Sequence, residues 1–166
     1  MTAIVSCGAL LVAAEGPYLR FYHAKDSRYI ASKRVFKAQA VHGISVYSEE
    51  HDDLIKLVVW GGSLIRALEI SLASGVAGSE LAFGESEVLK TSDWILDLAP
   101  RLSSLEDEGE YQEGTCVAVT AHNALLEITI SRPKANAGRP LYVMSILPPL
   151  ADYLLNCVLV NWCCLL

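Results

Sequence analysis

The sequence predicts an all-β protein made of antiparallel sheets, on three observations. Short apolar or β-branched runs alternate with turn residues, and helical periodicity is weak along the chain. Hardly any interval between runs could hold a crossover helix, which favours hairpins over parallel strands. The predicted strands span residues 9–13, 18–22, 33–36, 42–47, 54–60, 64–70, 87–90, 94–98, 116–120 and 124–130.

One hairpin pattern recurs three times. The segments LVAAEGPYLRFY (11–22), LVVWGGSLIRAL (57–68) and VAVTAHNALLEI (117–128) align without gaps, each with strand residues, a tight turn and a second strand. The second and third copies are preceded by a further strand, and the first and second are followed by one. Four strands in each recurring unit are typical of the blades of a β-propeller.

The spacing of the copies is uneven. The offsets are 46 and 60 residues (57 − 11 and 117 − 57), and we assign the difference to inserts at 73–85 and 103–115. A blade buries both faces against its neighbours, so its strands should be apolar almost continuously. LIKLVVW and CVAVT have this character. The sequence therefore predicts about three four-stranded blades.

Residues at equal places in the three copies have predicted roles. Gly16, Gly62 and His122 share one turn position, where glycine supplies a positive φ between the second and third strands. Arg66 aligns with Glu127 of the third copy. Because the two side chains have opposite charges, the position is expected to lie at the rim or surface of a blade. The residues expected to form turns or core are Gly16, His42, Gly43, Trp60, Gly62, Asp93, Trp94 and His122.

Four of these residues have more specific predicted roles. Asp93 and Trp94 are expected to form a turn at the start of a blade, with a buried indole. His42 and His122 lie at a strand start and a turn, where a hydrogen-bonding imidazole can hold a loop.

Together these segments resemble a known family. LVAAEGPYLRFY, VHGISVY, LVVWGGSLIRAL, SDWILDL and AVTAHNALLEI, in that order, resemble the N-terminal blades of the eukaryotic WD-repeat family that partners a tRNA 2′-O-ribose methyltransferase. No strand ends in Trp-Asp, so the repeats are degenerate. The resemblance covers residues 2–130 and implies an incomplete WD40-like β-propeller.

The function implied by the resemblance is that of a scaffold. The family implies a cytoplasmic, non-catalytic accessory subunit that supports 2′-O-ribose methylation at the anticodon wobble position. The expected partner is the catalytic methyltransferase subunit, and tRNA is contacted only indirectly. The alternative within the same architecture is a general protein-interaction scaffold in endosomal trafficking or signalling.

The chain is expected to divide near residue 130. Residues 2–130 form the incomplete propeller, and residues 131–166 form an irregular apolar tail that a truncated or mis-spliced gene would explain. Three blades cannot close a ring, and their uncovered faces and strand edges promote association. We therefore expect the chain alone to be poorly soluble or unstable.

Charge and cysteine content limit the possible functions. The net charge of −6 argues against direct, charge-driven binding to nucleic acid. The N-terminus lacks a basic region before its apolar run, which argues against a secretory signal, so the five cysteines are expected to be free thiols. An RNA-binding patch would be sought only among the scattered cations of the first blade, Arg20, Lys25, Arg28, Lys33, Arg34 and Lys37.

We expect no catalytic, cofactor or metal site, although several patterns allow one. Gly61-Gly62 would bind phosphate only if a helix followed. His42 and His122 could act as acid and base with a cysteine or serine nucleophile if all converged in one pocket. Cys116 and His122 would need two further ligands to hold a metal. The acidic segment 103–114 lacks the alternation of a calcium loop and could instead dock a basic partner.

The apolar tail allows a membrane-associated alternative. Pro148, Pro149 and Asp152 interrupt it, so residues 154–166 are too short for a transmembrane helix. The last four residues, Cys-Cys-Leu-Leu, fit a prenylation motif, but no polybasic stretch precedes them. A tail-anchored or prenylated protein is kept as the alternative, and membrane association is not expected.

Overall fold

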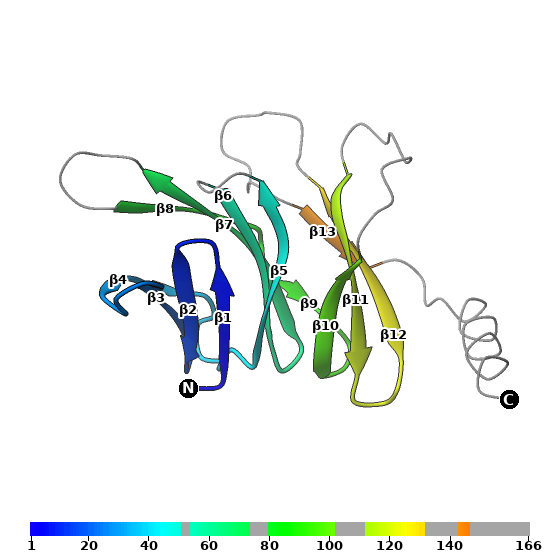
Figure 1. The fold of residues 1–166 in the computed structure, drawn as a ribbon. Coiled ribbons are helices and arrows are strands. Elements are labelled where there is room, and N and C mark those ends of the chain that lie inside the picture. The colour runs from blue at the N-terminus through cyan, green and yellow to red at the C-terminus, as the bar shows by residue number, and fades with distance from the viewer. Residues whose placement is uncertain (51–53, 74–79, 102–111, 132–142, 147–166) are drawn as a thin grey trace, which may run out of the picture.

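The computed structural model describes residues 1–50, 54–73, 80–101, 112–131 and 143–146 (Figure 1). These residues form three separate antiparallel sheets that follow one another along the chain. Within these ranges there is no helix. The predicted all-β, antiparallel class is therefore confirmed.

The first sheet has four strands in chain order. They are β1 (Ala3–Cys7), β2 (Leu10–Glu15), β3 (Tyr18–His23) and β4 (Tyr29–Arg34). Strand β1 was not predicted from the sequence. It pairs with β2 from Ala3 opposite Ala14 to Cys7 opposite Leu10, so the first hairpin also has a preceding strand.

The second sheet contains five strands. They are β5 (Gly43–Glu50), β6 (Leu54–Gly61), β7 (Leu64–Ala73), β8 (Glu80–Glu85) and the short β9 (Leu89–Lys90). Both β8 and β9 pair with β7, one after the other along its length. They act as one fourth strand that is interrupted in the middle.

The third sheet repeats the four-stranded order. Its strands are β10 (Ile95–Arg101), β11 (Gln112–Thr120), β12 (Leu125–Ser131) and β13 (Val143–Ile146). Strand β13 pairs with β12 through Ile128 opposite Ile146. This sheet thus includes residues beyond the boundary predicted near residue 130.

The three sheets pack face to face with their first strands nearest one another. Strand β5 contacts both β1 and β10, while β4 and β8 make a smaller contact on the other side of the first interface (Figure 1). The second sheet lies between the other two and is covered on both faces.

Two hydrophobic cores fill the interfaces. The core between the first and second sheets contains Leu10, Val12, Leu19, Phe21, Val41, Leu57, Val59, Leu68 and Ile70 among its buried residues. The core between the second and third sheets contains Val58, Trp60, Ile65, Ala67, Ile95, Leu98, Cys116, Ala118, Ile128 and Ile130. Successive residues of β6 alternate between the two cores, which follows from the two-residue period of a strand.

Strand β4 begins four residues earlier than predicted and ends two residues earlier. Val35 and Phe36, expected at the end of a strand, are buried in the connector to the second sheet, at 2% and 3% exposure. The Val35 N–H donates to the Pro17 carbonyl over 2.9 Å. The Arg34 guanidinium donates to the Phe36 carbonyl at 3.1 Å and to the Lys37 carbonyl, which holds this bend. These two residues are apolar because they enter a core, not because they extend a sheet.

Part of the predicted insert at 73–85 is strand. Residues 80–85 form β8, and Ser86 continues the pairing because its N–H donates to the Ala67 carbonyl over 3.0 Å. The Ser86 hydroxyl oxygen accepts a bond from the Ala67 N–H, also over 3.0 Å. The interruption before β9 therefore falls at Glu87 and Val88. Of the other predicted insert, 103–115, residues 112–115 belong to β11 and residues 103–111 lie outside the described ranges.

Two of the three aligned hairpins have the same turn. Gly16 and Gly62 each occupy the first position of a two-residue loop, with φ of 57° and 58°. The following residue has no positive φ, which matches a type II′ turn with glycine first.

The third hairpin differs from its prediction. Thr120 and Leu125 are separated by four loop residues, and Asn123, not His122, adopts the positive φ, at 60°. Asparagine tolerates this conformation better than most side chains. The predicted equivalence of His122 with Gly16 and Gly62 is therefore wrong, because the residue with the positive φ is the next one, Asn123. The longer loop also changes which residues of β11 and β12 lie opposite each other.

Two further glycines permit close approach. Gly43 lies opposite Trp60 in the β5–β6 pair, and a Cβ there would lie 2.0 Å from Cζ2 of the indole. A Cβ at Gly61 would lie 2.0 Å from the backbone oxygen of Ala40. The first glycine makes room for the largest side chain of the second core, and the other lets the connector pass over the β6–β7 turn.

We predict that Gly43→Ala destabilises the protein by roughly 1–3 kcal/mol, because the indole of Trp60 must leave its packed position. Chemical denaturation followed by far-ultraviolet circular dichroism measures this change. In a Trp60→Val background the same substitution should cost clearly less, because the clash is absent. An equal cost in both backgrounds would contradict this account.

Candidate functional site

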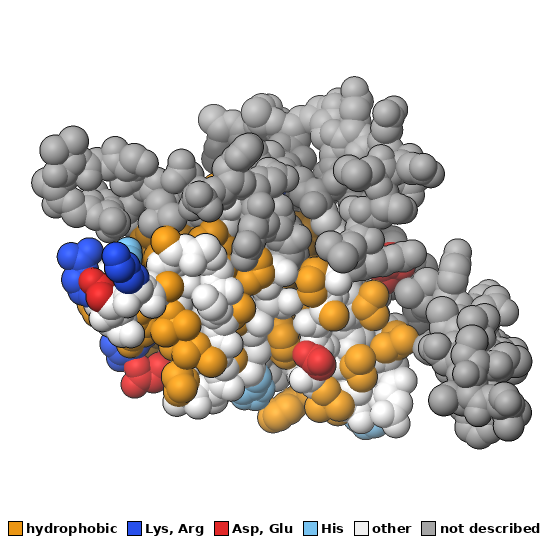
Figure 2. All heavy atoms as spheres, in the orientation of Figure 1, with side chains coloured by type: hydrophobic (Ala, Val, Ile, Leu, Met, Phe, Trp, Pro, Cys, Tyr) orange, Lys and Arg blue, Asp and Glu red, His pale blue; other side chains and the backbone are white. Residues whose placement is uncertain are grey.

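Four predicted residues gather at one edge of the molecule, where the second and third sheets meet. His42 precedes β5, Asp93 and Trp94 precede β10, and His122 lies in the β11–β12 loop. We call His42, Asp93, Trp94 and His122 the turn edge. Histidine side chains are visible along the lower border of the space-filling view (Figure 2).

Main-chain hydrogen bonds hold the segment before β10 between two turns. The Thr91 N–H donates to the Ser63 carbonyl and the Ile95 N–H to the Gly62 carbonyl, each over 2.9 Å. On the other side, the Ala121 N–H donates to the Trp94 carbonyl over 2.8 Å. The turn edge is therefore built on backbone that both neighbouring hairpins hold in place.

The Asp93 carboxylate organises the third-sheet side. Its Oδ1 accepts from the Trp94 N–H at 2.7 Å, and its Oδ2 accepts from the His122 N–H at 2.8 Å. Oδ2 also lies 3.0 Å from Nδ1 of His122. The backbone bond from His122, followed by bonds from the Thr120 hydroxyl, the His122 ring and the Trp94 N–H, lowers the pKa of Asp93 to about 2. This carboxylate thus acts as a hydrogen-bond acceptor within the loop.

His42 and Trp94 occupy the second-sheet side. Nδ1 of His42 accepts a bond from the Gly62 N–H at 3.3 Å, next to the β6–β7 turn. Its ring centroid lies 6.1 Å from that of Trp94, with the planes inclined by 47°. The imidazole therefore links a glycine turn to an aromatic side chain of the next sheet.

Trp94 is exposed, which contradicts the predicted buried indole. The residue is 57% exposed, whereas the next residue, Ile95, is 3% exposed and belongs to the second core. Ile95 begins β10 with its side chain in the core, whereas Trp94 lies just before the strand with its side chain toward solvent. The turn itself lies where the sequence places it.

The cysteine form of the enzyme alternative finds no exposed thiol among the described residues. Cys7 and Cys116 are each buried in a hydrophobic core, and burial raises the pKa of Cys116 to about 12. A thiol with this pKa is protonated at neutral pH. The other three cysteines lie outside the described residues.

The glycine pair and the possible metal ligands lie in surroundings that differ from those a ligand site needs. Gly61-Gly62 is followed by strand β7, so the turn presents no helix N-terminus to a phosphate. Within the described part of the chain, no three histidine, cysteine, aspartate or glutamate side chains are placed to hold a metal ion.

Protein groups occupy three of the six cations that the sequence offers as an RNA-binding patch. Arg20 pairs with Glu15, Lys33 Nζ lies 3.1 Å from Glu85, and Arg34 donates to the two carbonyls of the connector. Ion pairs of this kind reduce the charge available to a nucleic acid.

Arg66 is a residue whose role the sequence comparison missed. It lies at the interface of the first two sheets, with its side chain 18% exposed. Nη1 donates to the Val35 carbonyl at 2.8 Å and lies 3.3 Å from Glu85, and Nε donates to the Ser86 carbonyl at 3.0 Å. The predicted rim or surface position is therefore wrong. An arginine within the apolar run from Leu64 to Leu68 is the signal that could have shown it.

Several sequence predictions fall outside the described residues. They include most of the acidic segment 103–114 and the membrane interpretations of the tail at 154–166. In the part of the chain that the structure describes, no helix has the length and hydrophobicity needed to cross a membrane.

Comparison with protein-family models, curated proteins and solved structures finds no match to this chain.

We predict that Asp93→Asn removes a pH-dependent part of the stability. The pKa of Asp93 is about 2 in the folded protein and 3.8 ordinarily, so the ionised carboxylate stabilises the fold above about pH 4. This contribution is lost as the pH falls from about 4 to about 2. Denaturation midpoints over this range should fall more steeply for the native sequence than for the variant.

The matched control is His122→Ala, which removes the ring but keeps the N–H that contributes most to the lowered pKa. Its pH dependence should remain close to that of the native sequence. Equal slopes for Asp93→Asn and the native sequence would show that the carboxylate bonds do not matter for stability.

Proposed function

We propose that this protein is a non-catalytic scaffold with an incomplete WD40-like β-propeller. The observation that carries the proposal is the succession of three antiparallel sheets whose first strands, β1, β5 and β10, lie next to one another. In a propeller, blades pack face to face with the first strand of each nearest the central axis. The described architecture is compatible with three such blades.

The pattern of burial supports the same interpretation. In β6, Leu57 and Val59 enter the core with the first sheet, while Val58 and Trp60 enter the core with the third. A sheet with two apolar faces gains its stability from neighbouring repeats. Solenoids and propellers use this arrangement to present turns and loops to partner proteins.

The turn edge is the surface that we assign to partner binding. Trp94 is more than half exposed, yet main-chain bonds on both sides of it fix its backbone. Tryptophan is enriched among the residues that dominate binding at protein interfaces. Because this backbone is already held, little main-chain freedom is lost when a partner covers the indole.

The proposed partner is the catalytic subunit of a tRNA 2′-O-methyltransferase. Support comes from the resemblance of residues 2–130 to the WD-repeat family that accompanies such an enzyme. In this role the protein is cytoplasmic, positions the methyltransferase for wobble ribose methylation and contacts tRNA only through its partner.

The partner assignment predicts that the full-length gene product co-purifies with a tRNA 2′-O-methyltransferase. Deletion of the gene should abolish ribose methylation at the wobble position of the affected tRNAs, which mass spectrometry of tRNA digests measures. Unchanged methylation would contradict the tRNA role. A set of co-purified proteins dominated by endosomal components would favour the trafficking scaffold instead.

The binding surface generates a separate prediction. Trp94→Ser should weaken partner binding about tenfold or more, equivalent to about 1.4 kcal/mol or more, with little change in melting temperature because the indole is exposed. Quantitative co-precipitation measures the loss. Tyr29→Ser is the matched control, because Tyr29 is an aromatic residue of 50% exposure on the first sheet. Equal effects of the two substitutions would remove the turn edge from the interface.

A further inference from the structure

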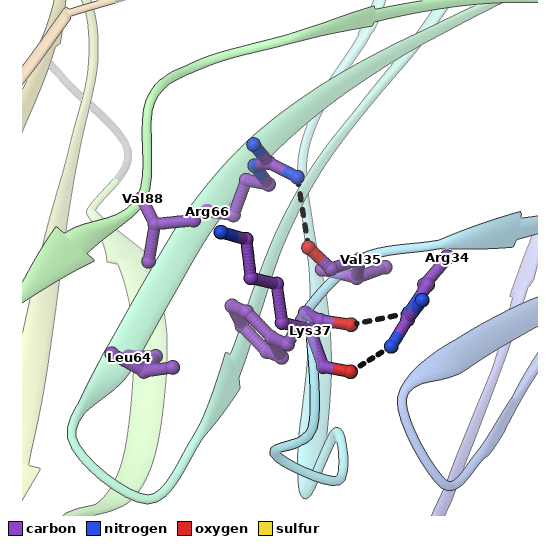
Figure 3. A pocket seen from close by; sticks show the side chains of 7 residues that line it. Arg34, Val35, Lys37, Leu64, Arg66 and Val88 are labelled. Atoms are coloured by element: carbon purple, nitrogen blue, oxygen red, sulfur yellow. Dashed lines mark hydrogen bonds between the residues drawn. The ribbon is translucent and has the colours of Figure 1, made fainter.

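A cleft lies at the junction of the first and second sheets. Its volume is about 440 Å³, within the range of about 300–1,000 Å³ that is usual for ligand clefts. Figure 3 shows the connector on one side and the second sheet on the other. The lining residues are Arg34, Val35, Phe36, Lys37, Leu64, Arg66 and Val88.

The walls of the cleft are apolar. Val35 and Phe36 come from the connector and are almost fully buried. Leu64 begins β7, and Val88 lies at the interruption between β8 and β9, where it is 39% exposed. Val88 is therefore available to contact a bound group from the solvent side.

Three cations line the cleft, and two of them are held by the protein. Arg34 donates to carbonyls of the connector, and Arg66 donates to the Val35 and Ser86 carbonyls beside Glu85. Lys37 is exposed, and its amino group makes no hydrogen bond or ion pair with the described residues. With Glu85 counted, the cleft keeps a positive charge in a chain whose net charge is −6.

The charged groups of the cleft lie toward one end and Leu64 lies toward the other. In Figure 3 the Lys37 side chain extends into the cleft, and its amino group lies on the same side as Arg66, while Leu64 lies at the other end. A bound group would therefore place its negative charge near Lys37 and Arg66 and its apolar part toward Leu64, with Val88 at its side.

We infer that this cleft binds a short segment of a partner protein in which a carboxylate side chain lies next to a bulky apolar one. Charge complementarity selects the acidic residue, and the apolar walls select its neighbour. The inference rests on the proposed scaffold role, but not on the tRNA methyltransferase as partner. The cleft and the turn edge are formed by different sheet interfaces.

The test uses the full chain and a fluorescein-labelled octapeptide in which a glutamate pair precedes Leu-Phe. Fluorescence anisotropy should detect binding that weakens as the ionic strength rises. Replacing the glutamates with glutamines, or Leu-Phe with Ser-Ser, should weaken binding roughly fivefold or more. Binding that ignores both replacements would overturn the inference.

Two protein variants locate the peptide. Lys37→Glu should weaken binding roughly fivefold or more, whereas Lys25→Glu, an exposed lysine in the β3–β4 turn, should leave it unchanged. Val88→Glu should abolish binding, while Val119→Glu, of similar exposure on the third sheet, should not. All four positions are exposed, and circular dichroism checks that each variant is folded.

Other outcomes overturn the inference without touching the proposed function. They are the absence of peptide binding, equal effects of Lys37→Glu and Lys25→Glu, and binding of a free fatty acid such as dodecanoate in place of the peptide. Co-purification with the methyltransferase is measured separately, so failure of the cleft and failure of the tRNA role can be distinguished.

Discussion

The structure depends on the burial of both faces of the second sheet. Strand β6 carries the run Leu57–Trp60, in which every side chain is nearly inaccessible to solvent. Burial of apolar side chains contributes about 1.5–3 kcal/mol each, and one neighbouring sheet could cover only half of them. The first and third sheets are therefore both required, and the chain order delivers one before and one after the second sheet. Strand β7 contributes to both cores in the same way, with Leu68 and Ile70 in the first and Ile65 and Ala67 in the second.

Close packing on both faces leaves little room for the segments that join the sheets. The indole of Trp60 occupies the space that a side chain at Gly43 would need. The carbonyl oxygen of Ala40 does the same at Gly61. At the first interface, Arg66 satisfies carbonyls of Val35 and Ser86 that would otherwise be left without partners beside the core. An apolar side chain at this place could not do so. The side chain of Arg66 thus satisfies the backbone of two segments that meet at this junction.

The sequence predicts the hairpins well because their signals are local. The β2–β3 and β6–β7 turns follow from glycine and strand patterning, and the buried runs follow from residues that alternate across a sheet. Strand β8 was not predicted because the sequence between β7 and β8 has no strand character, so residues 73–85 were assigned to an insert. The exposure of Trp94 and the burial of Val35 and Phe36 depend on which neighbour covers them, which no local pattern records. The sequence predicts roles for His42, Asp93, Trp94 and His122 one by one. It does not predict that they lie together, because the packing of the second sheet against the third brings His42 next to Trp94.

Both proposed binding surfaces lie at junctions between sheets, and this has an energetic consequence. The turn edge joins residues of the second and third sheets, and the cleft joins the connector from the first sheet to β7 and Val88 of the second. Neither surface exists within one isolated sheet. A partner that binds either surface therefore binds only the packed arrangement and stabilises it by linkage. Because repeats contact mainly their neighbours, each partner would stabilise one interface directly. Binding at the cleft would strengthen the first interface and binding at the turn edge the second, and the central sheet would couple the two.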